Sequence, residues 1–155
     1  MPAPALIPAL PACPPPSVVF APAGGGPRDL TVDVLARTLW GEGRSEPVRT
    51  VEAIAAVIIN RFGPGGSVLE VRSATEQFPC WSPVNPDHPR MLAVQPGEPV
   101  FDTCLRIARR ALSGLLPDRT GGATWYHHRM SFPTKARNRL PCAEIGNFLF
   151  YTNQE

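Results

Sequence analysis

The chain has 155 residues, which is enough for one ordinary domain and too few for two well-packed ones. Apolar residues make up 43% and charged residues 18% of the composition, which is typical of a globular protein and argues against wholesale disorder. The formal net charge is +2 and no dense run of Lys and Arg occurs, so we expect no nucleic-acid partner. No apolar run approaches the roughly 18 to 20 residues that span a bilayer, so we expect no membrane insertion.

Residues 1–29 differ in composition from the rest of the chain. The first 30 residues contain nine of the 20 prolines, a Gly triplet at 24–26 and only two charges, Arg28 and Asp29. Dense proline removes backbone donors and blocks helix formation, so this segment is predicted to be an extended leader or tether, followed by one folded domain at 30–155. It has no early basic residue and proline breaks its apolar stretch, which predicts no ordinary signal peptide and leaves the export route open.

Three helices are predicted where apolar residues repeat at helical spacing. The first begins near Thr31, which can cap it, and ends near Gly43. The second starts at about 45–47 and stops at the GPGG turn of 63–66, and the third spans about 100–114. The residues predicted to face the core are Leu35 and Leu39 in the first helix, Val51, Ile54, Ile58 and Phe62 in the second, and Phe101, Leu105, Ala108 and Leu112 in the third.

The last section, from Thr120, has a different character. The stretches TGGATWYHH and NFLFY combine aromatic and β-favouring residues with glycine turns, which predicts short strands. Several helices packed on a small, irregular antiparallel β region make an α+β fold.

Glu42 is the residue that stands out from the helical pattern. In projection it falls on the same stripe as Leu35 and Leu39, so its carboxylate is predicted to lie on a buried face at the end of a helix. Burial and the negative end of the helix dipole both disfavour the charged form, and both raise the pKa of a carboxyl group. A carboxyl that stays neutral near pH 7 suits a general acid in glycosidic cleavage. The flanking Gly41 and Gly43 are predicted to let a sugar approach the backbone closely.

A simpler interpretation of Glu42 is that the helix has already ended. The carboxylate would then face solvent and pair with Arg37 or Arg44. Because Glu is seldom buried, the local pattern alone favours this interpretation over a catalytic one.

Five stretches of the sequence carry a resemblance to a known family. They are LARTLWGEGRSEP, VEAIAAVIINR, QFPCW, PDRTGGATWYHH and IGNFLFY. Their order resembles the SleB-type cell wall hydrolase family, over about residues 30–151. The resemblance implies a lysozyme-like catalytic domain that acts on the glycan strands of bacterial peptidoglycan at the cell wall, with Glu42 as the catalytic acid. The sequence has WGEGR where YGEAR is usual, and a Pro-rich leader where a signal or binding domain is usual.

The resemblance also implies a reaction and a sugar-binding groove. The reaction is that of a lytic transglycosylase, which breaks the bond between N-acetylmuramic acid and N-acetylglucosamine and closes an anhydro ring. Plain hydrolysis would require a second carboxylate, for which Glu46, Glu52 and Glu76 are candidates. The expected substrate-binding residues are Trp40, Gln77, Phe78, Trp81, Thr124, Tyr126, His127, Asn147 and Tyr151.

Two alternatives belong to other functional classes. Cys80, His88, His127 and His128 have the residue types of a zinc amidase or a Cys/His peptidase acting on the peptide stems. Their spacing is not diagnostic, and adjacent strand residues such as His127 and His128 point to opposite faces, so only one is expected to join a site. We therefore expect no metal and no other cofactor.

The second alternative is a non-catalytic peptidoglycan-binding or structural module attached to a larger assembly through the leader. The same leader is compatible with an active phage-type or particle-borne lysin. The four cysteines, Cys13, Cys80, Cys104 and Cys142, are too few for a disulfide scaffold, and the sequence does not establish any pairing.

Overall fold

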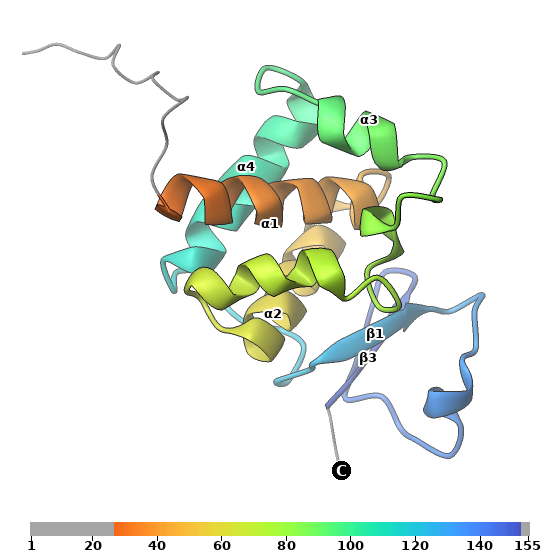
Figure 1. Ribbon diagram of the computed structural model, residues 1–155. Coiled ribbons are helices and arrows are strands. Elements are labelled where there is room, and N and C mark those ends of the chain that lie inside the picture. The colour runs from red at the N-terminus through yellow and green to blue at the C-terminus, as the bar shows by residue number, and fades with distance from the viewer. Residues whose placement is uncertain (1–26, 153–155) are drawn as a thin grey trace, which may run out of the picture.

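The structure, a computed structural model, describes residues 27–152. Helices make up most of this part of the chain, and a small sheet lies at one end of them (Figure 1). The long helices are α1 (Pro27–Gly43), α2 (Val48–Phe62) and α4 (Pro99–Leu112), and α3 (His88–Ala93) is short. The strands are β1 (Trp125–His128), β2 (Ala143–Ile145) and β3 (Phe148–Tyr151). Three 3-10 helices complete the set: η2 (Gly66–Ser73), η3 (Pro79–Trp81) and η4 (Thr134–Ala136).

Helix α1 begins four residues before its predicted start. Its first residue is Pro27, whose fixed φ suits the first turn and whose missing N–H has no helical partner at that position. Thr31, the predicted cap, therefore lies inside the helix and is buried. The predicted end at Gly43 is confirmed, and Leu35 and Leu39 are fully buried, as their spacing predicts.

Helices α2 and α4 are confirmed within two residues of their predicted bounds. Helix α2 follows Pro47 and ends at Gly63, which has a positive φ of 86° that favours glycine. Helix α4 ends two residues earlier than predicted and starts at Pro99. Its N-terminal cap is Glu98, whose carboxylate accepts hydrogen bonds from the backbone N–H of Phe101 (2.8 Å) and Val100 (3.3 Å).

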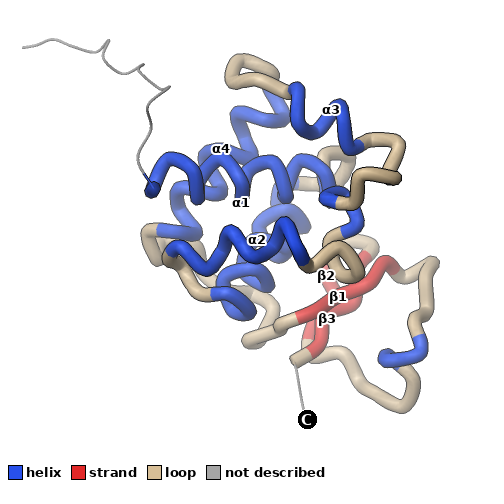
Figure 2. Tube along the Cα trace, viewed as in Figure 1, coloured by secondary structure: helices blue, strands red, loops and turns tan. Residues whose placement is uncertain are grey.

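The segment between α2 and α4 contains helical turns that the sequence pattern did not predict. Prolines and turn residues divide it into η2, η3 and α3, each too short for a helical hydrophobic period to show. In Figure 2 these turns alternate with loops beside the long helices. They matter for the site because η3 places Cys80 against the end of α1.

The sheet confirms the two predicted strands and adds a third. All pairs are antiparallel in the order β1-β3-β2, with Tyr126 opposite Phe150 and Ala143 opposite that same residue on the other side. Strand β2 has only three residues, too few for the alternation that marks a strand in sequence. The predicted α+β class is confirmed. No helix within residues 27–152 is both long enough and apolar enough to cross a membrane.

Candidate active site

Glu42 lies in the last turn of α1 and contacts two segments that are distant in sequence. The hydroxyl of Tyr126, on β1, donates a hydrogen bond of 2.7 Å to its Oε1. The backbone N–H of Cys80, in η3, donates to its Oε2 at 3.4 Å. The end of one helix, a 3-10 turn and a strand therefore meet at a single carboxyl group.

The solvent-facing interpretation of Glu42 is wrong. Arg37 forms its ion pair with Asp33, Nε to Oδ2 at 2.9 Å. Arg44 forms its ion pair with Asp87, Nη2 to Oδ2 at 3.0 Å. Neither of the two arginines proposed as partners of Glu42 therefore pairs with it. Its carboxyl accepts hydrogen bonds from neutral donors instead, the Tyr126 hydroxyl and the Cys80 N–H.

Burial raises the pKa of Glu42 above its ordinary value, as the sequence predicted. Hydrogen bonds from the Tyr126 hydroxyl and from the Cys80 thiol and N–H lower it, but they do not offset desolvation. The pKa of Tyr126 is in turn raised by burial and by the charge of Glu42. The pair is arranged so that the phenol keeps its proton and donates it as a hydrogen bond, while the carboxyl can exchange its own proton.

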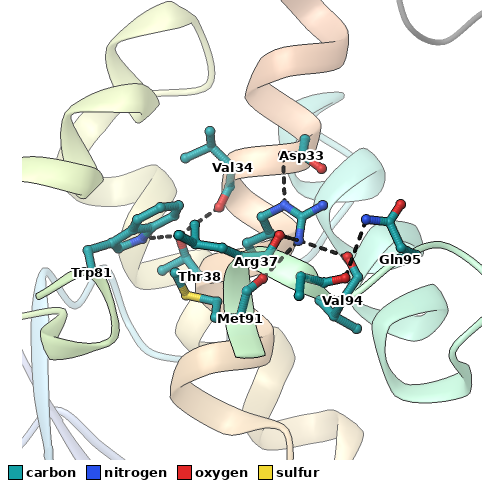
Figure 3. A network of polar contacts seen from close by, with 10 residues as sticks. Asp33, Val34, Arg37, Thr38, Trp81, Met91, Val94 and Gln95 are labelled. Carbon is teal, nitrogen blue, oxygen red and sulfur yellow. Dashed lines mark hydrogen bonds and ion pairs between the residues drawn. The ribbon is translucent and has the colours of Figure 1, made fainter. Parts of the chain in front are cut away.

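A network of polar contacts fixes η3 on α1 (Figure 3). The indole N–H of Trp81 donates to Thr38 Oγ1 at 2.9 Å, and the Thr38 hydroxyl donates to the Val34 carbonyl at 2.7 Å. Nearby, Arg37 Nη1 donates to the carbonyls of Met91 (2.8 Å) and Val94 (2.9 Å), which ties the end of α3 to the same helix. These contacts set the position from which Cys80 reaches Glu42.

The expected role of the flanking glycines is wrong. A Cβ on Gly41 would lie 2.6 Å from Cβ and 2.9 Å from Sγ of Cys80, so this glycine makes room for η3 and not for a sugar. A Cβ on Gly43 would lie 3.2 Å from Ile54, on α2. Both positions are thus small because the fold packs closely around the Glu42 turn.

A cavity with a volume of about 730 Å³ borders Glu42. It lies between the segment 73–79, the sheet and the loop that follows β1. Its lining residues are Glu42, Arg61, Ser73, Ala74, Thr75, Glu76, Gln77, Pro79, Tyr126, His127, His128, Ser131, Pro133, Lys135 and Phe148. Its size and open form suit part of a chain of sugar rings.

Three of the predicted substrate-binding residues line this cavity: Gln77, Tyr126 and His127. The amide of Gln77 is fixed, because Oε1 accepts from Arg61 and Nε2 donates to the Thr124 carbonyl at 3.3 Å. The ring of His127 is fixed as well, with Nε2 at 2.9 Å from the Tyr151 hydroxyl and Nδ1 at 2.8 Å from the His128 carbonyl.

Three further predicted residues lie in the core and do not line the cavity: Trp40, Phe78 and Trp81. Trp40 lies between the guanidinium of Arg44, 4.5 Å from its ring, and Glu98, which accepts from its indole N–H at 3.2 Å. Phe78 is fully buried and packs against Tyr126, with ring centroids 6.3 Å apart. These aromatic side chains pack in the core next to the site, and they are too buried to stack on a sugar ring.

The remaining three predicted residues lie around the sheet, outside the lining. Tyr151 is buried and stacks on Trp125 at 4.1 Å. Asn147 is exposed in the turn between β2 and β3, where its carbonyl accepts from the Arg129 N–H at 2.7 Å. The hydroxyl of Thr124 is buried without a hydrogen-bond partner in the structure.

The family model described as Cell Wall Hydrolase matches residues 45–151, more than half of the chain. The chain belongs to the cell wall hydrolase family. No curated protein and no solved structure matches it, so the lysozyme-like arrangement inferred from the motifs stays a prediction.

Membership in the cell wall hydrolase family supports a peptidoglycan-degrading role, with action at the cell wall. The match covers Gln77, Tyr126 and His127, which line the cavity. It begins three residues after Glu42, so the family match does not cover that residue.

The three candidates for a second carboxylate lie in different parts of the structure, and only one of them lines the same cavity as Glu42. Glu52 forms an ion pair with Arg110, Oε2 to Nη1 at 3.3 Å, on the side of α2 that faces α4. Glu46 borders a different, smaller cavity near the start of α4. Glu76 lines the same cavity as Glu42 and is exposed. Of the three, Glu76 is therefore the residue to test for a hydrolytic role.

The thiol and zinc alternatives of a cell wall hydrolase gain no support from the geometry. Burial, and then the charge of Glu42, raise the pKa of Cys80, which opposes formation of a nucleophilic thiolate. His88 binds the carbonyl of Cys80 through Nδ1 at 2.9 Å. Within residues 27–152 no three His, Cys, Asp or Glu side chains gather as metal ligands would.

The structure also brings in residues that sequence reasoning missed. His128 lines the cavity together with His127, because the cavity continues past the end of β1 to Ser131 and Pro133. Arg61 and Lys135 line it as well. The only signal for Lys135 was that it is the single lysine of the chain.

Proposed function

We propose that this cell wall hydrolase cleaves the glycan strand of bacterial peptidoglycan between N-acetylmuramic acid and N-acetylglucosamine, with Glu42 as the general acid. The observation that carries the proposal is a half-buried carboxyl, with a pKa raised by desolvation, at the edge of a large open cavity. A poorly basic glycosidic oxygen requires an acid that still holds its proton near neutral pH. The family match supplies the substrate class.

The proposed reaction is that of a lytic transglycosylase. Glu42 gives its proton to the glycosidic oxygen as the bond to C1 of the muramic acid breaks, and C1 takes on oxocarbenium character. The resulting carboxylate accepts a hydrogen bond from Tyr126 and then takes the proton of the C6 hydroxyl, whose oxygen bonds to C1 and closes the anhydro ring. The carboxyl ends in its starting state, so a single acid/base suffices.

The positions of the other acidic residues bear on the choice between this route and hydrolysis. Hydrolysis with inversion requires a second carboxyl about 6.5 to 9.5 Å away, with room for a water molecule between the two. Glu46 and Glu52 contribute to other surfaces, and Glu76 is the acidic residue that shares the cavity. If Glu76 acts as a base, Glu76→Gln will abolish activity; for a transglycosylase it will leave most of it.

The decisive experiment is to digest purified peptidoglycan and identify the products by mass spectrometry. Anhydromuramic ends are expected. Reducing muramic ends would show that the enzyme is a hydrolase of the same bond. New free amino groups with intact glycan would show that the peptide stems are cut, and would overturn the proposal. Glu42→Gln is expected to remove cleavage while wall binding persists.

We also propose that residues 1–29 tether the domain to a larger assembly, such as a phage particle, as their composition suggests. Most of this segment lies outside the described residues, and the first helix starts at Pro27. A variant without residues 1–26 is therefore expected to digest purified walls at the full rate and to lose association with the particle. Equal association with and without the segment would remove it from any attachment role.

A further inference from the structure

Two cations face the same cavity as Glu42 from different parts of the chain. Arg61 lies in the last turn of α2, and Lys135 lies in η4, in the connection between β1 and β2. Both side chains belong to exposed residues, so their charged ends can be reached from solvent. Neither forms an ion pair with a carboxylate of residues 27–152.

Each of these cations is held in place by neutral or aromatic groups. The Nζ of Lys135 lies 4.4 Å from the centroid of the Trp125 ring, and that ring is itself stacked on Tyr151. Arg61 donates a hydrogen bond to Oε1 of Gln77, and its guanidinium carbon lies 5.5 Å from the centroid of Phe62. Contacts of this kind position a positive charge without neutralising it.

The charges around Lys135 are mainly of one sign. Burial lowers its pKa first, and repulsion by Arg61 and by Arg139 lowers it further. The charge of Glu76 opposes these effects as the smallest contribution. Bringing like charges together around a concave surface is unfavourable unless an anion is bound there.

We propose that Arg61 and Lys135 form a carboxylate-binding subsite, through which the enzyme selects glycan whose muramic acid carries a free carboxylate. The proposal rests on the proposed function, because it assigns the substrate of the same cavity. Peptidoglycan offers this anion in two ways: in the peptide stem, or as the lactyl carboxylate where the stem has been removed. A polymer of N-acetylglucosamine alone carries neither.

The test uses the full-length Glu42→Gln protein, which binds without turnover, and a muramyl peptide disaccharide as ligand. Amidation of the ligand's carboxyl groups provides the uncharged partner. Calorimetry is expected to show that amidation weakens binding, and that Arg61→Gln and Lys135→Gln each weaken binding of the charged ligand about three- to fivefold. Lys135→Arg keeps the charge and is expected to retain most of the affinity. Arg106→Gln, on the exposed face of α4, is the matched control and is expected to change nothing.

A second pair of ligands shows whether the bound carboxylate belongs to the peptide stem or to the lactyl group. A disaccharide with its lactyl group free is compared with the one that bears a stem, and the tighter charge-dependent binding identifies the source. Equal affinity for charged and amidated ligands, or unchanged affinity in both Gln variants, would overturn the subsite. Because binding is measured without cleavage, a protein that cuts no glycan but shows the charge dependence would contradict only the proposed function. The converse result would contradict only the subsite.

Discussion

The hydroxyl of Tyr126 donates a 2.7 Å hydrogen bond to the carboxyl of Glu42, although 84 positions separate the two residues in the chain. The bond stabilises the ionised form of the acid and so lowers its pKa, against the larger effect of burial. Tyr126 thereby sets how readily Glu42 gives up its proton.

Tyr126→Phe is expected to move the alkaline limb of the pH–rate profile to higher pH by about one unit, which corresponds to one hydrogen bond to a charged acceptor. The rate at low pH is expected to fall about tenfold, because the carboxylate left after proton donation loses its donor. Wall turbidity measured from pH 4 to 9 would show both effects. Tyr151→Phe serves as the control, because it removes a hydroxyl that contacts His127 and not Glu42. The alkaline limb of its pH–rate profile is expected to stay where it is in the wild type. A shift of the Tyr126→Phe limb to lower pH would contradict the assignment.

Glu42→Gln is expected to abolish cleavage and to change how stability depends on pH. The folded carboxyl has a raised pKa, whereas the unfolded chain ionises it in the ordinary range. The wild type therefore loses stability as the pH rises from that ordinary range through the folded pKa, and the variant does not. The difference favours the variant by about 1.4 kcal/mol for each pKa unit between the two states.

Denaturant unfolding at pH 4 and pH 8 measures this difference. The advantage of the Gln variant should be larger at pH 8. An advantage that is equal at both values would mean that Glu42 ionises freely in the folded protein.

The position of Glu42 was predictable from sequence, but its partners were not. The stripe of Leu35, Leu39 and Glu42 follows from the helical period, which is local; in the structure the two leucines are fully buried and Glu42 is half-buried, with a pKa raised by desolvation. The contacts with Cys80 and Tyr126 depend on how η3 and β1 pack, which no short-range pattern encodes. Aromatic residues were the least predictable, since a tryptophan in a core and one in a groove look alike in sequence.

Gly41→Ala tests whether close packing at the Glu42 turn is needed. The new methyl group would meet Cβ and Sγ of Cys80 well inside van der Waals distance, so η3 has to move. Overpacking of this kind destabilises a protein by about 1 to 3 kcal/mol. Gly65→Ala adds the same methyl group with no heavy atom within 4 Å and serves as the control. Unfolding free energies equal to wild type in both variants would show that the turn adapts without strain.

Thr38→Val changes a residue of α1 that does not line the cavity. The change keeps the shape of the side chain but removes the acceptor for the Trp81 indole N–H, which is buried. Leaving a buried donor without a partner is expected to lower the free energy of unfolding by about 1 to 3 kcal/mol.

Because Trp81 directly follows Cys80, loosening its anchor should also weaken the donation from Cys80 to Glu42, whose pKa would then rise. The expected signature is an alkaline limb at higher pH together with lower stability. Arg37→Met supplies the comparison, since it removes donors to the carbonyls of Met91 and Val94 and is expected to lower stability alone. If both variants lower stability and neither moves the limb, the network in Figure 3 supports the fold without tuning the acid.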